Sequence, residues 1–114
     1  MSKQYSALRE RMETRTLDNG LRICYLPKEG FSKTFAILAT NFGSVDASFT
    51  CEGRRYDTPA GVAHFLEHKM FEDQDGNALQ KFARTGASPN AFTSQTMTAY
   101  HFSCTDRFEE NLEI

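Results

Sequence analysis

Residues 58–70 read TPAGVAHFLEHKM, and this stretch decides how the rest of the chain is interpreted. Within it, His64, Glu67 and His68 form the pattern H-x-x-E-H. Thr58 suits the N-cap of a helix, and the proline after it suits the first helical position, where its missing N–H costs nothing. Positions four residues apart lie one turn apart on the same helix face. The stretch therefore predicts a helix on which the two histidines and the glutamate lie close together.

This spacing is typical of the inverzincin zinc-site motif. Two imidazoles one turn apart can bind a single zinc ion, and a carboxylate on the same face can take a proton from water. His64 and His68 are therefore candidate metal ligands, and Glu67 is a candidate general base. The alternative interpretation is that two ordinary surface histidines flank an ordinary glutamate, and the pentapeptide alone leaves both open.

The apolar residues of the same stretch recur at helical spacing and define one side of the helix. At about 100° per residue, the motif residues fall on the opposite side. We therefore expect the apolar side to pack into a core and the motif side to line a cleft. The apolar side comprises Val62, Phe65, Leu66 and Met70, and the motif side comprises His64, Glu67, His68 and Phe71.

Three features are expected before the motif helix. Residues 13–17 and 21–26 flank Asp18-Asn19-Gly20, a strong turn signal, and predict a hairpin. Residues 35–42 form a nearly continuous apolar run that suits a strand covered on both faces. Residues 46–57 are polar and contain glycine, so we expect a connection that leads into the helix.

Two further helices are expected after the motif. The first is predicted from Asp75 as N-cap to residue 84 or 85, with Gly86 as its stop. Thr105 and Asp106 can cap the second, which begins just before the end of the chain.

The segment between these helices is typical of strands. Residues 90–94 suit an extended conformation, and residues 97–104 alternate with the period of two that a half-buried strand shows. Together with the helices, this pattern predicts an α+β fold in which an antiparallel or mixed sheet carries helices on one face. The apolar face of the last strand would hold Tyr100, Phe102 and Cys104, and the other face His101.

Length and composition exclude several classes of protein. The 114 residues allow one small domain at most, and the net charge of −2 with dispersed basic residues excludes a nucleic-acid interface. No apolar run approaches the roughly 20 residues that a membrane span needs, and no signal-peptide core is present, so we expect a cytoplasmic protein. Three cysteines without a C-x-x-C pair suit reduced thiols.

Several motifs together resemble the peptidase family that includes pitrilysin, insulin-degrading enzyme and the mitochondrial processing peptidase, with the bacterial branch nearest. The zinc helix of that family is similar to residues 61–68. Its opening hairpin is similar to residues 19–22, and its next strand with a Gly-Ser end is similar to residues 35–44. Its Asn-Ala-x-Thr segment is similar to residues 90–93, after Gly86 and before Thr98 and Tyr100.

The resemblance implies roles for individual residues. His64 and His68 would be zinc ligands, and Glu67 would be the general base of peptide hydrolysis. Asn90, Ala91 and Phe92 would lie on an edge strand to which the substrate adds as a further strand, a mode that predicts broad specificity. Without the resemblance, these three residues fit the plain start of a strand.

The resemblance also implies that residues 1–114 are the N-terminal part of a metallopeptidase catalytic domain and do not complete it. The third zinc ligand of the family is a glutamate several tens of residues beyond the second histidine, past Ile114. Glu109, Glu110 and Glu113 are too near to take that role. We therefore expect Zn²⁺ in the full-length protein, whereas the 114-residue chain by itself is expected to be inactive and can lack the metal.

The predicted function is that of a zinc-dependent endopeptidase acting on peptides or unfolded chains, alone or as a homo- or heterodimer. One alternative is a non-catalytic subunit of the same family that binds peptide or a partner. The intact Glu67 argues against it, because such a subunit does not need the base. The other alternative is a structural α+β domain with an accidental motif.

Overall fold

The computed structural model describes residues 1–73 and 76–114. Its contacts divide the chain into two compact units, Met1–Ser32 and Lys33–Ile114. Both units contain antiparallel strands, and the second also contains α-helices. The predicted α+β class is therefore confirmed.

The first unit is a three-stranded antiparallel sheet with the order β1-β2-β3. The predicted hairpin is confirmed as β2 and β3, and Asn19 closes its turn by accepting a hydrogen bond from Leu21 N (3.0 Å). Gly20 has φ +87°, a conformation that glycine adopts without strain. The elements are β1 (Ser2–Tyr5), one turn of 3-10 helix (Ser6–Leu8), β2 (Glu10–Thr16) and β3 (Arg22–Tyr25).

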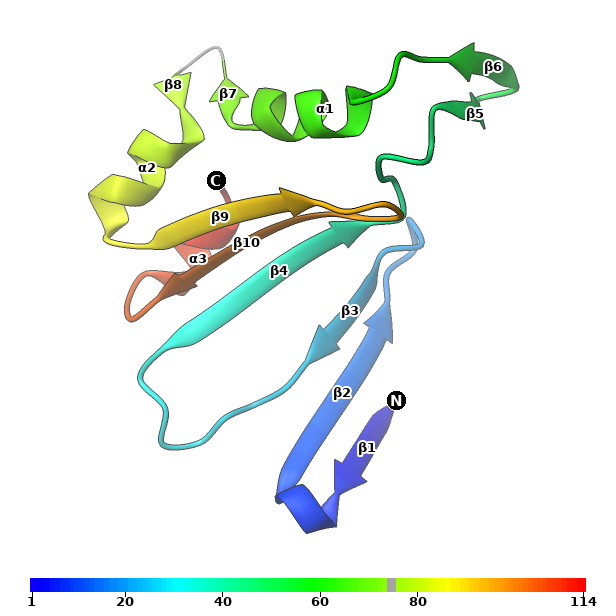
Figure 1. Ribbon diagram of the computed structural model, residues 1–114. Helices are drawn as coiled ribbons and strands as arrows, with labels where there is room; N and C mark the ends of the chain where they lie inside the picture. The colour runs from blue at the N-terminus through cyan, green and yellow to red at the C-terminus, as the bar shows by residue number, and fades with distance from the viewer. Residues whose placement is uncertain (74–75) are drawn as a thin grey trace. The chain divides into compact units, whose positions relative to one another are not determined.

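The second unit has a central antiparallel sheet in the order β4-β10-β9 (Figure 1). Strands β5 and β6 form a separate two-stranded ladder, as do β7 and β8. Its strands are β4 (Thr34–Thr40), β5 (Ser48–Cys51), β6 (Arg54–Asp57), β7 (Glu72–Asp73), β8 (Gly76–Asn77), β9 (Ser88–Thr93) and β10 (Thr98–Cys104). Its helices are α1 (Val62–Met70), α2 (Ala78–Thr85) and α3 (Phe108–Leu112).

The helices cover one face of this sheet, as predicted. Tyr100 and Phe102 point to the same face of β10, because alternate residues of a strand share a face. Phe71, at the end of α1, contacts the Tyr100 ring with 6.0 Å between centroids. Phe82 of α2 and Phe108 of α3 contact Phe102 at 5.5 and 5.7 Å. A small aromatic core thus joins all three helices to β10.

The strand predicted over residues 35–42 forms as β4, but the expectation that both of its faces are covered is wrong. Phe35, Ile37 and Leu38 are each more than half exposed. The reason is the strand order: β4 is an edge strand, and the helices contact β9 and β10.

The connection expected over residues 46–57 is instead the β5–β6 hairpin. Its turn is Glu52-Gly53, and both residues have positive φ (51° and 76°). Phe49 and Tyr56 face each other across the two strands, with stacked rings 5.5 Å apart. Cross-strand aromatic pairs of this kind stabilise a hairpin.

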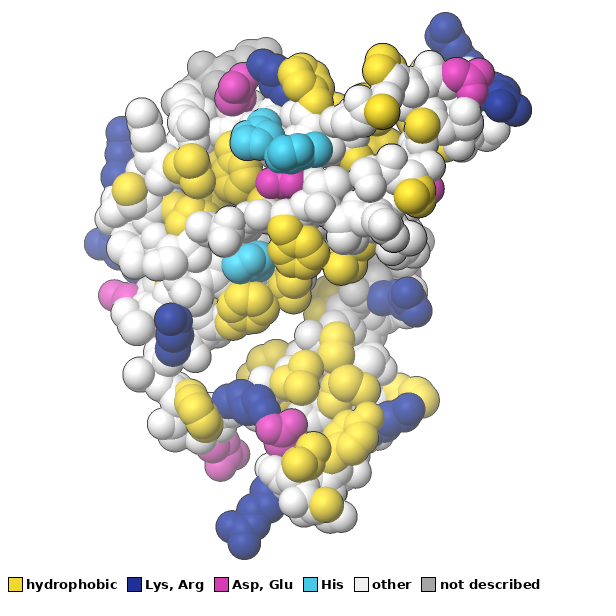
Figure 2. All heavy atoms as spheres, in the orientation of Figure 1, with side chains coloured by type: hydrophobic (Ala, Val, Ile, Leu, Met, Phe, Trp, Pro, Cys, Tyr) yellow, Lys and Arg dark blue, Asp and Glu magenta, His cyan; other side chains and the backbone are white. Residues whose placement is uncertain are grey.

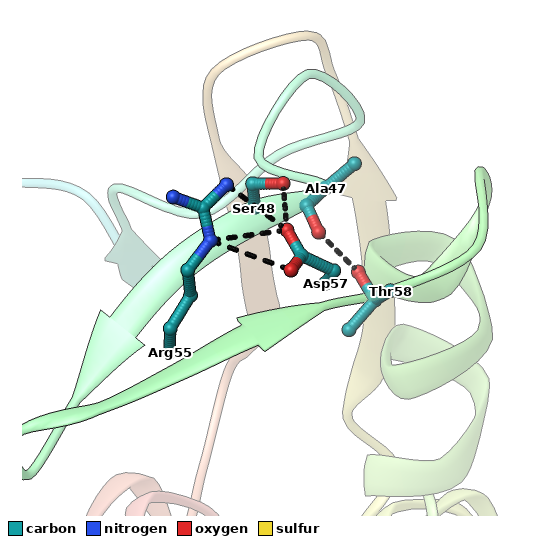
Figure 3. A network of polar contacts seen from close by, with 5 residues as sticks. All are labelled: Ala47, Ser48, Arg55, Asp57 and Thr58. Atoms are coloured by element: carbon teal, nitrogen blue, oxygen red, sulfur yellow. Dashed lines mark hydrogen bonds and ion pairs between the residues drawn. The ribbon is translucent and has the colours of Figure 1, made fainter.

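Thr58 closes this hairpin and does not cap the motif helix, so the predicted N-cap is wrong. Its hydroxyl donates to the Ala47 carbonyl oxygen at 2.9 Å (Figure 3). Its backbone N–H donates to the same oxygen at 2.7 Å. Helix α1 begins at Val62, after Gly61 with φ +89°. The hairpin therefore leads directly into the helix that carries the motif.

The other predicted helix caps also differ from the structure. Asp75 lies outside the described residues, and α2 is capped by Asn77, whose side chain accepts a hydrogen bond from Leu79 N (2.8 Å). The predicted stop at Gly86 is confirmed, with φ +74°. Helix α3 has Arg107 at its N-cap, and neither Thr105 nor Asp106 takes that position.

The hairpin carries an acid-sensitive contact. Ser48 donates to the Asp57 carboxylate, and Arg55 lies 3.3 Å from it (Figure 3). The Ser48 hydrogen bond and then the Arg55 contact lower the pKa of Asp57 below its ordinary value of 3.8. Because the folded pKa is the lower one, this contact stabilises the hairpin above pH 3.8, and the stabilisation is lost as the pH falls through the folded pKa.

We therefore expect the protection factors of the hairpin amides, which correct exchange rates for the pH dependence of intrinsic exchange, to fall below about pH 4. Ser48→Ala removes the larger cause of the lowered Asp57 pKa and should move this loss of protection to higher pH. Asp57→Asn should make the exchange protection independent of pH in this range. If the protection of the hairpin amides depended on pH in the same way in the wild type and in Ser48→Ala, the role of the Ser48 hydrogen bond would be contradicted.

Candidate metal centre

Two imidazole nitrogens converge on the exposed side of α1. The Nε2 atoms of His64 and His68 are 3.1 Å apart, and the ring centroids are 4.9 Å apart. Figure 2 shows the two neighbouring histidine side chains at the surface with an acidic side chain beside them. Ligand atoms of His64, Glu67 and His68 all lie within 4.8 Å of one another. The predicted group of three is thus brought together as the helical spacing requires.

The two nitrogens fit a zinc ion. Zinc binds histidine nitrogen at about 2.0–2.1 Å in tetrahedral geometry, which places two ligand nitrogens about 3.3 Å apart. The 3.1 Å separation of His64 and His68 Nε2 is close to that requirement. Both side chains are exposed, so the ion and a substrate can reach them from solvent.

Glu67 lies on the buried face of α1, next to the sheet. It is only 8% exposed, and Ala63, one turn earlier, is 1% exposed. The small alanine lets the helix approach the sheet closely, where the Thr93 hydroxyl of β9 donates to Glu67 Oε2. A buried carboxylate needs such a partner, because an unpaired charge is costly away from water.

The expected orientation of the helix is therefore wrong. Phe65, Leu66 and Met70 of the predicted buried side are 59, 45 and 69% exposed, whereas Glu67 is buried. The histidines do face solvent, as a metal site open to substrate requires. The sheet thus holds the acid of the motif and leaves both imidazoles free.

Tyr100 of β10 contributes to the surroundings of Glu67. Burial raises the pKa of the Tyr100 phenol above its ordinary value of 10.0, and the charge of Glu67 raises it further. The phenol is therefore neutral near Glu67 at physiological pH. It adds no competing negative charge to the site.

The proposed substrate residues lie on β9, an edge strand of the sheet within the described ranges. Ala91 is opposite Tyr100, so it points to the helix-covered face, and its neighbours Asn90 and Phe92 point to the other. The Asn90 side chain accepts a hydrogen bond from Ala91 N (2.9 Å). The edge position is as expected, and the binding role of these residues stays a prediction.

The third histidine takes no part in the group. His101 lies on the opposite face of β10, where its ring contacts Phe35 and Phe92 at centroid distances of 5.4 and 6.4 Å. Glu109, Glu110 and Glu113 belong to α3 or its end and lie outside the group of potential ligands.

Thr93 is the contact residue that the sequence interpretation missed. The Asn-Ala-x-Thr segment contains this residue, but no sequence pattern links it to Glu67, 26 positions earlier in the chain. A threonine at the end of a strand has many ordinary uses, so only the packing of α1 on β9 reveals the contact.

Comparisons with known proteins agree with this geometry. Residues 47–114 match the sequence profile of the family described as Insulinase (Peptidase family M16). The chain is 48% identical, over 112 residues, to the uncharacterized zinc protease YmfH of Bacillus subtilis (strain 168), covering 96% of this chain and 26% of that protein. It is 29% identical, over 106 residues, to the mitochondrial-processing peptidase subunit beta of Caenorhabditis elegans, covering 87% of this chain and 21% of that protein.

A solved structure agrees with the fold as well. A crystal structure of a protein described as an M16-like peptidase from Alicyclobacillus acidocaldarius matches with a TM-score of 0.84 and 41% identity. The match covers 90% of this chain and 24% of that one. The chain thus spans about a quarter of the length of the zinc protease and of the solved structure that it matches.

Proposed function

Because the chain belongs to the insulinase family, peptidase family M16, we propose that it is part of a zinc-dependent endopeptidase that acts on peptides or unfolded polypeptides. The observation that carries this proposal is the convergence of His64 and His68 Nε2, 3.1 Å apart, with Glu67 on the same helix. The zinc protease named above, 48% identical to this chain, supports the same chemistry.

Each motif residue has a distinct role in this proposal. His64 and His68 would hold the zinc ion through Nε2. When bound, zinc lowers the pKa of its water and polarises the carbonyl group of the scissile peptide bond. Glu67 takes a proton from the attacking water and then delivers it to the leaving amine. One oxygen of Glu67 is bonded to Thr93, so the other is available for this proton.

The substrate would bind along β9. An extended peptide that adds to the free edge of a sheet is held mainly by main-chain hydrogen bonds, which read little sequence. Its alternate side chains would then meet Ala91 on one face and Asn90 and Phe92 on the other. This mode suits peptides and unfolded chains, because a folded protein offers few free strands.

The remaining parts of the active enzyme would come from outside residues 1–114. A catalytic zinc site takes three protein ligands and water, and the described residues supply two histidines besides the base. The third ligand would follow later in the full-length protein.

We also propose that the full-length protein assembles into a dimer, because one relative is named as a subunit. The compartment that we propose is the cytoplasm. In the described ranges, no helix is long and apolar enough to cross a membrane.

Zinc content tests this proposal directly. We expect the purified full-length protein to carry about one zinc ion per chain by atomic emission. His64→Ala combined with His68→Ala should lower the occupancy below about one tenth, because a single remaining protein ligand binds zinc weakly. His101→Gln is the matched control and should keep the wild-type content. A zinc-free wild type, or full zinc in the double variant, would overturn the proposal.

A further inference from the structure

We propose that Thr93 is a positioning residue for the base, and that β9 thereby sets the position of Glu67 relative to the bound substrate. The inference rests on the proposed function and extends it to a residue outside the H-x-x-E-H motif. Its basis is the contact between the Thr93 hydroxyl and Glu67 Oε2, made between an edge strand and the buried face of α1.

The contact restricts a side chain that otherwise has several rotamers. Glu67 has three side-chain torsions, and its carboxylate can rotate so that either oxygen faces the histidines. The hydrogen bond from Thr93 ties Oε2 to the sheet and leaves Oε1 outside that bond. A base held in one orientation transfers a proton more efficiently than one that samples several.

The position of Thr93 is itself fixed by the backbone around it. Thr93 is the last residue of β9 and pairs with Thr98 across the turn. Ser94 N donates to Met97 O at 2.7 Å, and Ser44 N donates to Ser94 O at 2.9 Å. The turn that follows Thr93 is thus closed by one hydrogen bond and joined to Ser44 by another. These bonds fix the end of the strand that carries the Thr93 hydroxyl.

The same strand carries the proposed substrate edge. Ala91 and Phe92 lie immediately before Thr93 in β9, so a peptide that adds to this edge lies on the backbone that also holds the base. A shift of β9 would move substrate and base together. This arrangement keeps the distance from Glu67 to the scissile bond constant for peptides of different sequence.

The test compares Thr93→Val, Thr93→Ser and Thr98→Val in the full-length protein, with a quenched fluorescent peptide that the wild type cleaves. Thr93→Val should lower kcat by about 10- to 100-fold and leave KM within about twofold, because the base is misplaced while the binding edge remains. Thr93→Ser keeps the hydroxyl and should restore most of kcat.

Thr98→Val is the matched control. Thr98 is the cross-strand partner of Thr93, and its hydroxyl donates to Phe42 O at 2.7 Å. The same chemical change there removes a structural hydrogen bond without touching Glu67. We expect it to lower stability and to leave kcat within about twofold.

A second readout requires neither zinc nor activity. In metal-free protein, Thr93→Val should lower the unfolding midpoint by about 2–4 °C when Glu67 is present, and by less than about 1 °C in a Glu67→Ala background. A wild-type kcat in Thr93→Val, no rescue by serine, or equal midpoint shifts in both backgrounds would overturn the inference. A wild type that cleaves no peptide would refute the proposed peptidase function. If Thr93→Val still shifted the midpoint only when Glu67 is present, the contact between Thr93 and Glu67 would stand.

Discussion

Glu67→Gln in the full-length protein is expected to lower kcat/KM for peptide hydrolysis by about 10²- to 10⁴-fold, with bound zinc unchanged. Glutamine has nearly the same shape, and its amide oxygen can still accept the hydrogen bond from Thr93. It cannot take a proton from water at neutral pH. The loss therefore reports the base itself, because the fold, the histidines and the substrate edge all remain.

Glu72→Gln provides the control for this variant. Glu72 follows α1 closely, is exposed and forms an ion pair with Lys69 at 2.6 Å. The same substitution there should leave the rate within about twofold, because exposed ion pairs contribute little. A Glu67→Gln variant with wild-type activity would refute the general-base role. A wild type that binds zinc and peptide without cleaving it would favour the alternative of a non-catalytic subunit.

The parts of the site that the sequence predicted are those determined by local geometry. The approach of His64 and His68 follows from helical spacing alone, and the structure places their Nε2 atoms 3.1 Å apart. The first hairpin follows from Asn19-Gly20, and the end of α2 follows from Gly86. Each of these features depends on a few consecutive residues whose backbone preferences are strong.

The buried face of α1 could not be predicted in the same way. Apolar periodicity favoured burial of Phe65, Leu66 and Met70, but the sheet contacts the face of Ala63 and Glu67. That choice depends on a small side chain that permits close approach and on Thr93, which compensates a buried carboxylate. The second condition joins residues 26 positions apart in the chain, so no local pattern contains it.

The β5–β6 hairpin was missed for a different reason. Its turn, Glu52-Gly53, requires positive φ at a glutamate, which that residue type adopts only rarely. The aromatic pair of Phe49 and Tyr56 and the bonds of Thr58 to Ala47 stabilise the hairpin once it forms. Polar composition predicts only a connection and not its two strands, because the stabilising contacts are made between the strands.

Gly43→Ala is expected to destabilise the protein by about 1–3 kcal/mol, because the added methyl group would meet backbone atoms. A Cβ at this position would lie 2.5 Å from the carbonyl carbon of Gln95 and from Met97 N. Backbone atoms cannot turn away as a flexible side chain can. The turn around Gly43 is also held by Asp46, whose carboxylate accepts from Gly43 N at 2.7 Å, so it cannot move outward without losing that bond.

Urea unfolding of metal-free full-length protein measures this effect, and Ser44→Ala is its control. Ser44 is exposed and bonds to Ser94 through its backbone, so its substitution should change the unfolding free energy by less than about 0.5 kcal/mol. A Gly43→Ala variant as stable as the wild type would contradict the close approach of Gly43 to the backbone of Gln95 and Met97.

Because Gln95 and Met97 lie in the turn between β9 and β10, their displacement should also move Thr93. The Gly43→Ala variant should therefore lose kcat as well as stability, whereas Thr98→Val should lose stability alone.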